Sequence, residues 1–187
     1  MTDLPDGFRE TAFGPLPESW KVAKLRDVGR VVTGRTPSTK EEKFWREGTV
    51  PFITPVDLQG SAIRVATRSI SQDGLQVSRA LPQGTVLVSC IGYIGKVGVV
   101  ESPVAATNQQ INAVVPDERI AYNWYLAYAA MYQETDLISR ARMTTVPILS
   151  KTNFEEVLIP LPPLPEQRAI AHVLRTVQQA REATERV

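Results

Sequence analysis

The proline-rich segment near the end of the chain sets the strongest limit on its fold. Residues 160–165 read "PLPPLP". Proline fixes φ and carries no backbone N–H, so this run must be extended and must end whatever element precedes it. The run therefore separates the preceding part of the chain from a polar, helix-favouring tail. Its prolines are Pro160, Pro162, Pro163 and Pro165.

The residues after the prolines predict a helix that begins at Pro165. Proline suits the first helical position, and Glu166 lies favourably against the positive end of the helix dipole. Apolar and small residues then recur at steps of three and four, which is the spacing of a coiled-coil seam. This seam comprises Ile170, Val173, Val177, Ala180, Thr184 and Val187.

A helix of this length is marginal in water on its own, so its apolar stripe needs a covering surface. Two arrangements meet that need. Either the helix folds back onto its own domain, or it leaves the domain through a proline hinge and pairs with a partner helix. The seam is short and contains Ala and Thr, and the pattern leaves both arrangements open.

The residues before the prolines predict an α+β domain. Two apolar runs, 86–91 and 97–100, are separated by a loop that contains Gly92 and Gly95, which favours a hairpin. Other runs rich in β-forming residues are bounded by Pro, Gly and Ser. These runs cover residues 31–32, 49–54, 62–67 and 111–115.

Helical signals are fewer than strand signals. Residues 69–80 allow a turn of helix, and apolar residues at helical spacing predict a longer helix over 123–141. Many strands followed by one long helix and a terminal helix favour a mixed or antiparallel β-rich core with a few helices, and not a doubly wound sheet.

Composition restricts the compartment and the mode of binding. Twenty-one basic and twenty acidic residues give a formal charge of +1, so the chain does not coat nucleic acid by charge alone. Cys90 is the only cysteine, which excludes an intrachain disulfide and indicates a reducing compartment. The opening "MTDLPDGFRE" is not a signal peptide, and no stretch has the length of a membrane span. We expect a cytoplasmic protein with no membrane partner.

The sequence offers little to an enzyme. The only histidine, His172, lies in the terminal helix without a nearby nucleophile, and Cys90 lies inside an apolar strand. There is no phosphate-binding glycine loop, and no cofactor or metal is expected. A divalent-metal nuclease would have to use Glu41, Glu42 and Lys43, which lie in a charged loop typical of a solvated surface.

Five segments, in order along the chain, are similar to one family. The chain resembles the specificity subunit of type I restriction-modification systems, specifically one target-recognition domain with the start of its spacer helix. The segments are "GPLPESWKVAKLRDVGRVVTGRTP", "VPFITPVDL", "LPQGTVLVSCIGYIGKVGVV", "ATNQQINAVVP" and "TVPILSKTNFEEVLIPLPPLPEQRAIAHVL".

The resemblance implies a DNA-reading module without catalysis of its own. Each recognition domain in such systems reads one half of a split target in double-stranded DNA, and adenine methylation and restriction belong to partner methyltransferase and restriction subunits. The resemblance divides this chain into two parts. Residues 1–160 are a recognition domain, with 1–15 as a lead-in, and residues 161–187 are a proline hinge with a spacer or dimerisation helix. Family members carry two such halves in tandem, so the partner helix is expected in a second copy or a second repeat.

Base edges are read by polar side chains on exposed loops, with Arg or Lys suited to guanine and Asn or Gln suited to adenine. Four loop segments supply these groups. The candidate DNA-binding residues are Arg35, Thr36, Ser38, Thr39, Lys40, Lys43, Arg46, Tyr93, Lys96, Asn108, Gln109, Gln110, Arg140, Arg142, Thr144 and Thr145.

Each group also has a structural explanation. The amides of Asn108, Gln109 and Gln110 are also suited to bonding the neighbouring backbone, and the basic residues to an ordinary solvated surface. The alternative function is a protein-interaction scaffold that uses the terminal helix and does not touch DNA. Charge reversal in the loops would separate the two, because a scaffold tolerates it.

Overall fold

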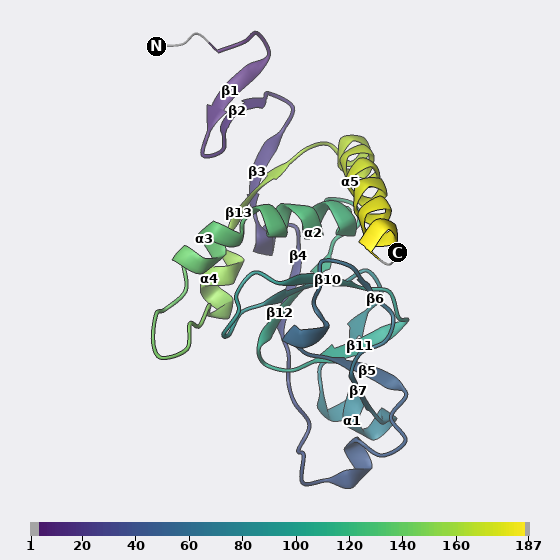
Figure 1. Cartoon of the computed structure of the whole chain (residues 1–187). Helices are drawn as coiled ribbons and strands as arrows, with labels where there is room; N and C mark the ends of the chain where they lie inside the picture. The colour runs from purple at the N-terminus through teal and green to yellow at the C-terminus, as the bar shows by residue number, and fades with distance from the viewer. Residues whose placement is uncertain (1–3, 186–187) are drawn as a thin grey trace.

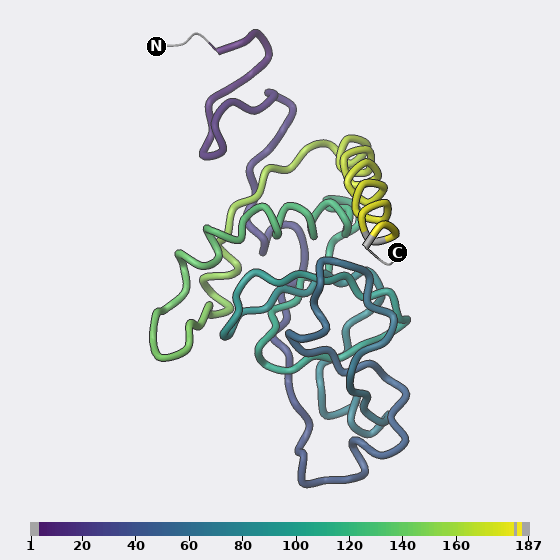
Figure 2. The backbone as a smooth tube through the Cα atoms, viewed as in Figure 1, coloured from purple at the N-terminus to yellow at the C-terminus, as the bar shows by residue number. Residues whose placement is uncertain are grey.

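The computed structural model describes residues 4–185 and has the α+β architecture that the sequence predicts (Figure 1). Of two central sheets, the larger packs beneath α2 (Asn123–Tyr132), and the long helix α5 (Leu164–Glu185) lies beside α2. The tube in Figure 2 shows the N-terminal segment projecting from one end of the molecule, away from both sheets.

The larger sheet has the strand order β4-β12-β9-β10-β6. All its pairs are antiparallel except the edge pair of β6 with β10. Alternate residues of β9 enter different cores: Val86 and Val88 pack beneath α2, while Leu87 packs with Ile111 on the opposite face. The strands are β4 (Gly29–Thr33), β6 (Ala62–Ile63), β9 (Val86–Ser89), β10 (Val97–Val100) and β12 (Ile111–Pro116).

The smaller sheet has the order β7-β5-β11-β8 and a small apolar cluster of its own. Trp45 packs edge-on against Phe52 with their ring centroids 5.2 Å apart. The helix α1 (Gln72–Val77) follows β7 and is capped by the Ser71 side chain, which accepts a hydrogen bond from the Gly74 N–H. The strands are β5 (Val50–Ile53), β7 (Arg68–Ile70), β8 (Leu81–Pro82) and β11 (Val104–Thr107).

Two strand pairs lie outside these sheets, and the sequence did not predict either of them. The hairpin of β1 (Phe8–Thr11) and β2 (Gly14–Pro17) occupies the expected lead-in. The strand β3 (Lys21–Lys24) pairs with β13 (Leu158–Leu161), so the proline run begins inside a strand. Pro160 is tolerated there because a two-stranded sheet leaves one side of each strand without ladder partners.

The helix predicted over 123–141 is wrong in its continuity. It is two helices, α2 and α3 (Glu134–Ser139), which break at Gln133, where ψ is 13°. The break reorients the chain so that Leu137, fully buried, enters the same core as Leu126.

Shorter helices complete the fold: η1 (Leu25–Asp27), η2 (Glu42–Phe44), η3 (Pro55–Asp57) and α4 (Lys151–Glu155).

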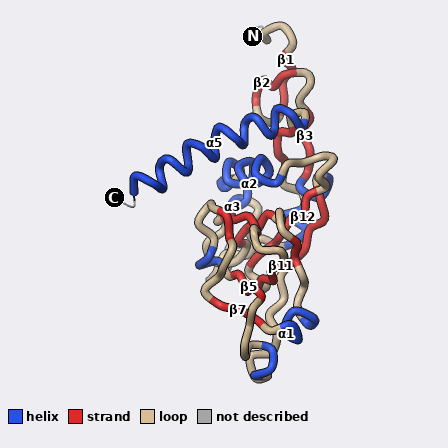
Figure 3. Tube along the Cα trace, turned by 90° about the vertical axis from the view of Figure 1, so that its right-hand side faces the viewer, coloured by secondary structure: helices blue, strands red, loops and turns tan. Residues whose placement is uncertain are grey.

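The terminal helix α5 begins at Leu164, one residue before the predicted start. One side of it packs on its own domain, where Ala171 is fully buried and Ile170 is half-buried against the core. The rest of the expected seam faces outward: Val173 and Val177 are 60% and 62% exposed, and Ala180 and Thr184 are exposed too. Val187 lies outside the described residues. Figure 3 shows the C-terminal half of α5 extending away from the sheets.

Candidate nucleic-acid interface

The antiparallel order of the larger sheet brings four strand ends to one edge. Thr33 at the end of β4 pairs with Asn112, Ile111 at the start of β12 pairs with Ser89, and Val97 starts β10 opposite Val88. The loops that leave these strands therefore meet. We call this surface the loop end; it comprises residues 34–36, 90–96 and 108–110 together with the adjoining loop 142–148.

The first contact at the loop end joins the segment after β4 to the turn before β12. Arg35 N–H donates to Thr107 O at 2.9 Å, and the Thr36 hydroxyl donates to Gln109 Oε1 at 2.7 Å. Gly34 makes this approach feasible, because a Cβ at that position would overlap the backbone of Asn108. The Arg35 side chain remains exposed to solvent.

The three amides of the turn divide into two roles. Asn108 Nδ2 donates to Gln110 Oε1 at 2.8 Å, and Asn108 Oδ1 accepts from the Gln110 N–H at 3.1 Å, so these two half-buried residues shape the turn. Gln109 lies between them and is exposed. Gln109 is therefore the amide of this turn that is best placed to contact a ligand.

A rigid loop presents Tyr93 and Lys96. The buried Ser89 hydroxyl donates to Tyr93 O and accepts from the Lys96 N–H at 2.9 Å, which clamps both ends of the loop. Tyr93 is nevertheless 80% exposed, and Lys96 Nζ lies 5.2 Å from the centroid of its ring. An aromatic ring and a cation are thus held outward together.

The loop between α3 and α4 completes the surface. Gly92 N–H donates to Pro147 O at 3.0 Å, Ile91 forms a bridge with Ile148, and Cys90 N–H donates to Gln110 O at 2.7 Å. These contacts join segment 90–96 to segments 108–110 and 142–148, and the Thr36–Gln109 bond adds segment 34–36. Its exposed polar residues from this loop are Arg142, Thr144 and Thr145.

Arg140 belongs to the same sequence segment but not to the same surface. Its Nε lies 2.6 Å from Asp136 Oδ2, and its side chain is 33% exposed. Asn153 Nδ2 donates to Arg140 O at 2.9 Å and fixes the backbone as well. Arg140 is therefore held against α3, the helix that contains its acidic partner Asp136.

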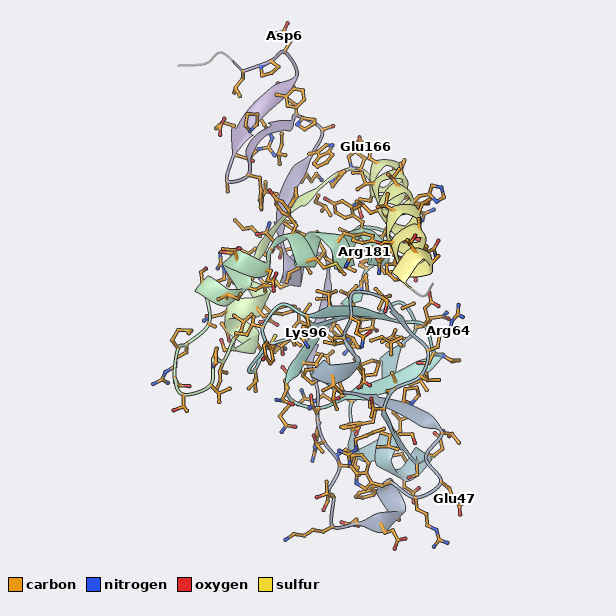
Figure 4. All side chains as sticks on the ribbon, in the orientation of Figure 1. Asp6, Glu47, Arg64, Lys96, Glu166 and Arg181 are labelled. Carbon is orange, nitrogen blue, oxygen red and sulfur yellow. The ribbon has the colours of Figure 1, made fainter. Side chains whose placement is uncertain are left out.

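Five further candidates lie on a separate lobe around η2, beside the smaller sheet. In Figure 4 the neighbouring Glu47 marks this lobe, well below Lys96. Lys43 pairs with Glu41 at 3.2 Å and Arg46 with Glu47 at 3.7 Å, while the guanidinium of Arg68 lies 4.1 Å from the Trp45 ring centroid. These five residues are Ser38, Thr39, Lys40, Lys43 and Arg46.

Arg79 also lies beside the end of β4, although sequence patterns did not point to it. Its Nη1 donates to Thr33 O at 2.7 Å, and the neighbouring Ser78 hydroxyl donates to Arg35 O at 3.2 Å. This exposed arginine follows α1, far in sequence from β4, so only the tertiary fold brings it to Arg35. The local sequence shows only that a basic residue follows a short helix, and this does not indicate that Arg79 lies beside Arg35.

Neither Cys90 nor His172 lies among groups that would activate it in the described part of the chain. Cys90 is buried, accepts a hydrogen bond from Asn112 Nδ2 at 3.2 Å, and burial raises the pKa of its thiol to about 12. His172 is exposed on α5. No cluster of three His, Cys, Asp or Glu suited to a metal occurs within residues 4–185. Over the same residues, no helix has the length and apolar character to cross a membrane.

The fold is already known from solved structures. A chain from a study of complex assembly and conformational transition of the type I R-M system aligns with a TM-score of 0.75 at 25% identity, covering 96% of this chain and 43% of that one. The HsdS subunit from Thermoanaerobacter tengcongensis aligns with a TM-score of 0.73 at 24% identity, covering 97% and 42%, and supports the fold.

The chain belongs to the family of the type I restriction modification DNA specificity domain, whose model matches residues 17–186. The type I restriction enzyme MjaIX specificity subunit of Methanocaldococcus jannaschii is 34% identical over 174 residues, which is 89% of this chain and 40% of that protein. The HindI specificity subunit of Haemophilus influenzae is 34% identical over 106 residues, or 55% and 23%. The chain thus spans less than half the length of these relatives.

Proposed function

We propose that this chain is the sequence-specific DNA-recognition subunit of a type I restriction-modification system. It reads one half of a bipartite target in double-stranded DNA and directs adenine methylation and restriction by partner subunits. In this proposal residues 1–160 form the recognition domain, and residues 161–187 form the proline hinge and the spacer helix. The chain has no catalytic role; the methyltransferase and restriction subunits supply the chemistry, in the cytoplasm.

The observation that carries this proposal is the convergence at the loop end. Segments more than 70 residues apart in the chain meet there and expose arginine, lysine, amide and hydroxyl groups on one surface. Base readout and phosphate contact need this set of groups. The hydrogen bonds beneath the surface hold the loops in place before binding, which reduces the entropy lost on binding.

Different residues of the loop end suit different parts of DNA. Gln109 suits adenine, and Arg35 and Arg142 suit guanine or phosphate. Lys96 suits a phosphate, and the ring of Tyr93 offers an apolar contact such as that made with a thymine methyl. The candidates on the η2 lobe, Lys43 among them, are assigned here to phosphates beyond the half-site.

The outward seam of α5 supports a helical partner. Val173 and Val177 are exposed in the middle of a helix whose other side is occupied by its own domain. We assign the partner helix to a second copy of the chain or to a second recognition repeat, with the methyltransferase subunits docked on the same helices. Joining two modules also explains how a chain of formal charge +1 reaches useful affinity, because linked sites bind more tightly than either alone.

The proposal is tested by charge reversal at the loop end. Arg35→Glu combined with Arg142→Glu is expected to abolish preference for the target while leaving assembly with the methyltransferase subunit intact. Arg119→Glu, an exposed change beyond the other end of β12, is the matched control and should bind as the unaltered chain does. Target binding that survives the double change would favour the scaffold function instead.

A further inference from the structure

The helix α5 contacts its own domain through three polar side chains as well as through Ala171 and Ile170, while Val173 and Val177 face outward. Gln167, Ala171, Arg175 and Gln178 follow one another at steps of four, four and three, so they lie on one helix face. That face is turned toward α2 and its neighbours, whereas Val173 on another face is 60% exposed. The apolar stripe of a surface helix usually faces the core, whereas α5 combines polar and apolar contacts on that side and leaves Val173 and Val177 exposed.

The first polar anchor is Gln167, which is fully buried. Its Oε1 accepts a hydrogen bond from the Tyr122 N–H at 2.8 Å. Its Nε2 donates to Ile120 O at 3.0 Å and to Pro162 O at 2.8 Å. One amide therefore ties together the proline run, the segment that precedes α2 and the first turns of α5.

The second anchor lies about 16 Å further along the helix, eleven residues at 1.5 Å each. Gln178 accepts a hydrogen bond from the Tyr128 hydroxyl at 2.9 Å and donates through Nε2 to Gly60 O at 2.9 Å. Gly60 follows η3, so this amide connects α5 both to α2 and to the chain leading into β6.

Arg175 lies between the two anchors. Its guanidinium is 4.2 Å from the Trp124 ring centroid, and its Nη2 lies 3.8 Å from Glu101 Oε1. Glu101 also accepts from Arg64 Nε at 2.9 Å, and Arg64 projects on this side of the molecule (Figure 4). Stacking on a ring requires the flat face of a guanidinium, which a lysine does not supply.

Hydrogen bonds fix both direction and register, because they weaken steeply when donor and acceptor move out of line. A helix held by apolar contacts alone tolerates rotation and sliding far better. Two directional anchors on one face therefore define the angle of α5, its rotation about its own axis and its position along α2.

We infer that Gln167, Arg175 and Gln178 are positioning residues that hold α5 at one angle and one register on the recognition domain, so that a half-site is read at one fixed separation from the spacer. The geometric part concerns the isolated chain. The consequence for DNA rests on the proposed function. Neither Gln167 nor Gln178 contacts DNA in this scheme; each acts through the placement of the loop end.

The geometric part is tested by a distance measured between two spin labels. Ala183→Cys on α5 and Asp73→Cys on α1 provide exposed attachment sites, and the buried Cys90 thiol, with its pKa raised to about 12, resists labelling. Dilution with unlabelled chain restricts the signal to pairs within one molecule. Double electron–electron resonance then reports the distribution of distances between the two spin labels.

The unaltered chain is expected to give one narrow distribution. Arg175→Ala combined with Gln178→Ala should broaden it and shift its maximum, while Gln179→Ala, an exposed neighbour on the same helix, should not. Arg175→Lys alone should also broaden the distribution, because a lysine keeps the positive charge but loses the planar stacking on the Trp124 ring. A broad distribution in the unaltered chain, or an unchanged one in the double variant, would overturn the inference.

Gln167→Ala would leave buried backbone groups unpaired and so could prevent folding. For this reason the test uses the variant with Arg175→Ala and Gln178→Ala, in which Gln167 is kept.

The functional consequence has a separate readout. Reconstituted with a methyltransferase subunit and offered half-sites at varied separations, the unaltered chain should direct methylation at one separation and the double variant at several. One separation for both would overturn the DNA part, whereas methylation without any sequence preference would remove the proposed function and leave the distance result standing.

Discussion

The hydroxyl of Thr36 donates a hydrogen bond to Oε1 of Gln109 across 73 residues of sequence, at a distance of 2.7 Å. This bond joins the segment that leaves β4 to the turn that enters β12. It places an exposed amide beside the exposed Arg35, at the edge where the loops of the larger sheet meet.

Gln109→Ala is expected to reduce discrimination between the target and an altered half-site by about 1–3 kcal/mol, because a bidentate amide contact to adenine is worth this much. The measurement is competitive binding of the reconstituted complex to the two duplexes. Gln83→Ala, which removes an exposed amide near the start of β9 at the opposite end of that strand, should leave the ratio unchanged. If both substitutions changed the ratio equally, Gln109 would not be a base-reading residue.

Lys96→Ala is expected to weaken binding to all duplexes alike. A lysine on a phosphate releases about one counterion, so the slope of log affinity against log salt should fall by about 1. The measurement is a salt titration with target and unrelated duplexes. Tyr93→Ala serves as the contrasting change, since it should alter preference and leave the salt slope as it was. An unchanged slope after Lys96→Ala would place this lysine away from the backbone of the DNA.

Gly34→Ala is expected to destabilise the fold by about 1–3 kcal/mol, the usual cost of forcing extra atoms into a packed site. The added Cβ would overlap Asn108 O and Thr107 Oγ1. Urea denaturation measures the change, and Arg35→Ala at the next, exposed position should be nearly neutral. A midpoint that does not move after Gly34→Ala would mean that the loops separate without cost.

Val173→Asp combined with Val177→Asp is expected to abolish self-association through α5. Two carboxylates in an apolar seam cannot be buried without a large desolvation cost. Light scattering over a concentration series measures the mass, and His172→Asp, exposed on the same helix, is the control. A chain that stays monomeric before any substitution would exclude the second copy as partner and leave a second repeat.

Local patterns were enough for the strands of the larger sheet and for the extended proline run, whereas β7, β8 and β11 of the smaller sheet were not predicted. The apolar runs of β9 and β10 and the glycines between them determine their hairpin from nearby residues alone. The polar β1 carries no alternation of apolar residues, and β3 and β13 are joined across more than 130 residues, so neither pair has a strong local signal.

The same distinction separates the candidate residues. The exposure of Arg35, Gln109 and Arg142 follows from their loops, but the surface they form depends on pairing in the larger sheet. Arg140 could not be told from Arg142 by composition, because Asp136 lies one helical turn earlier and reaches only one of them. The docking of α5 could not be predicted from apolar periodicity for a related reason: Gln167, Arg175 and Gln178 contribute to the contact with the domain, whereas Val173 and Val177 of the seam face outward.

The proposed role in DNA recognition is tested most directly by mapping methylation. The chain is reconstituted with a methyltransferase subunit and supplied with long duplexes of varied sequence, and the methylated adenines are located by sequencing. The account predicts methylation at one bipartite target, lost when Arg35 and Arg142 are both reversed to glutamate. Methylation spread without sequence preference, or a target that survives the reversal, would contradict it.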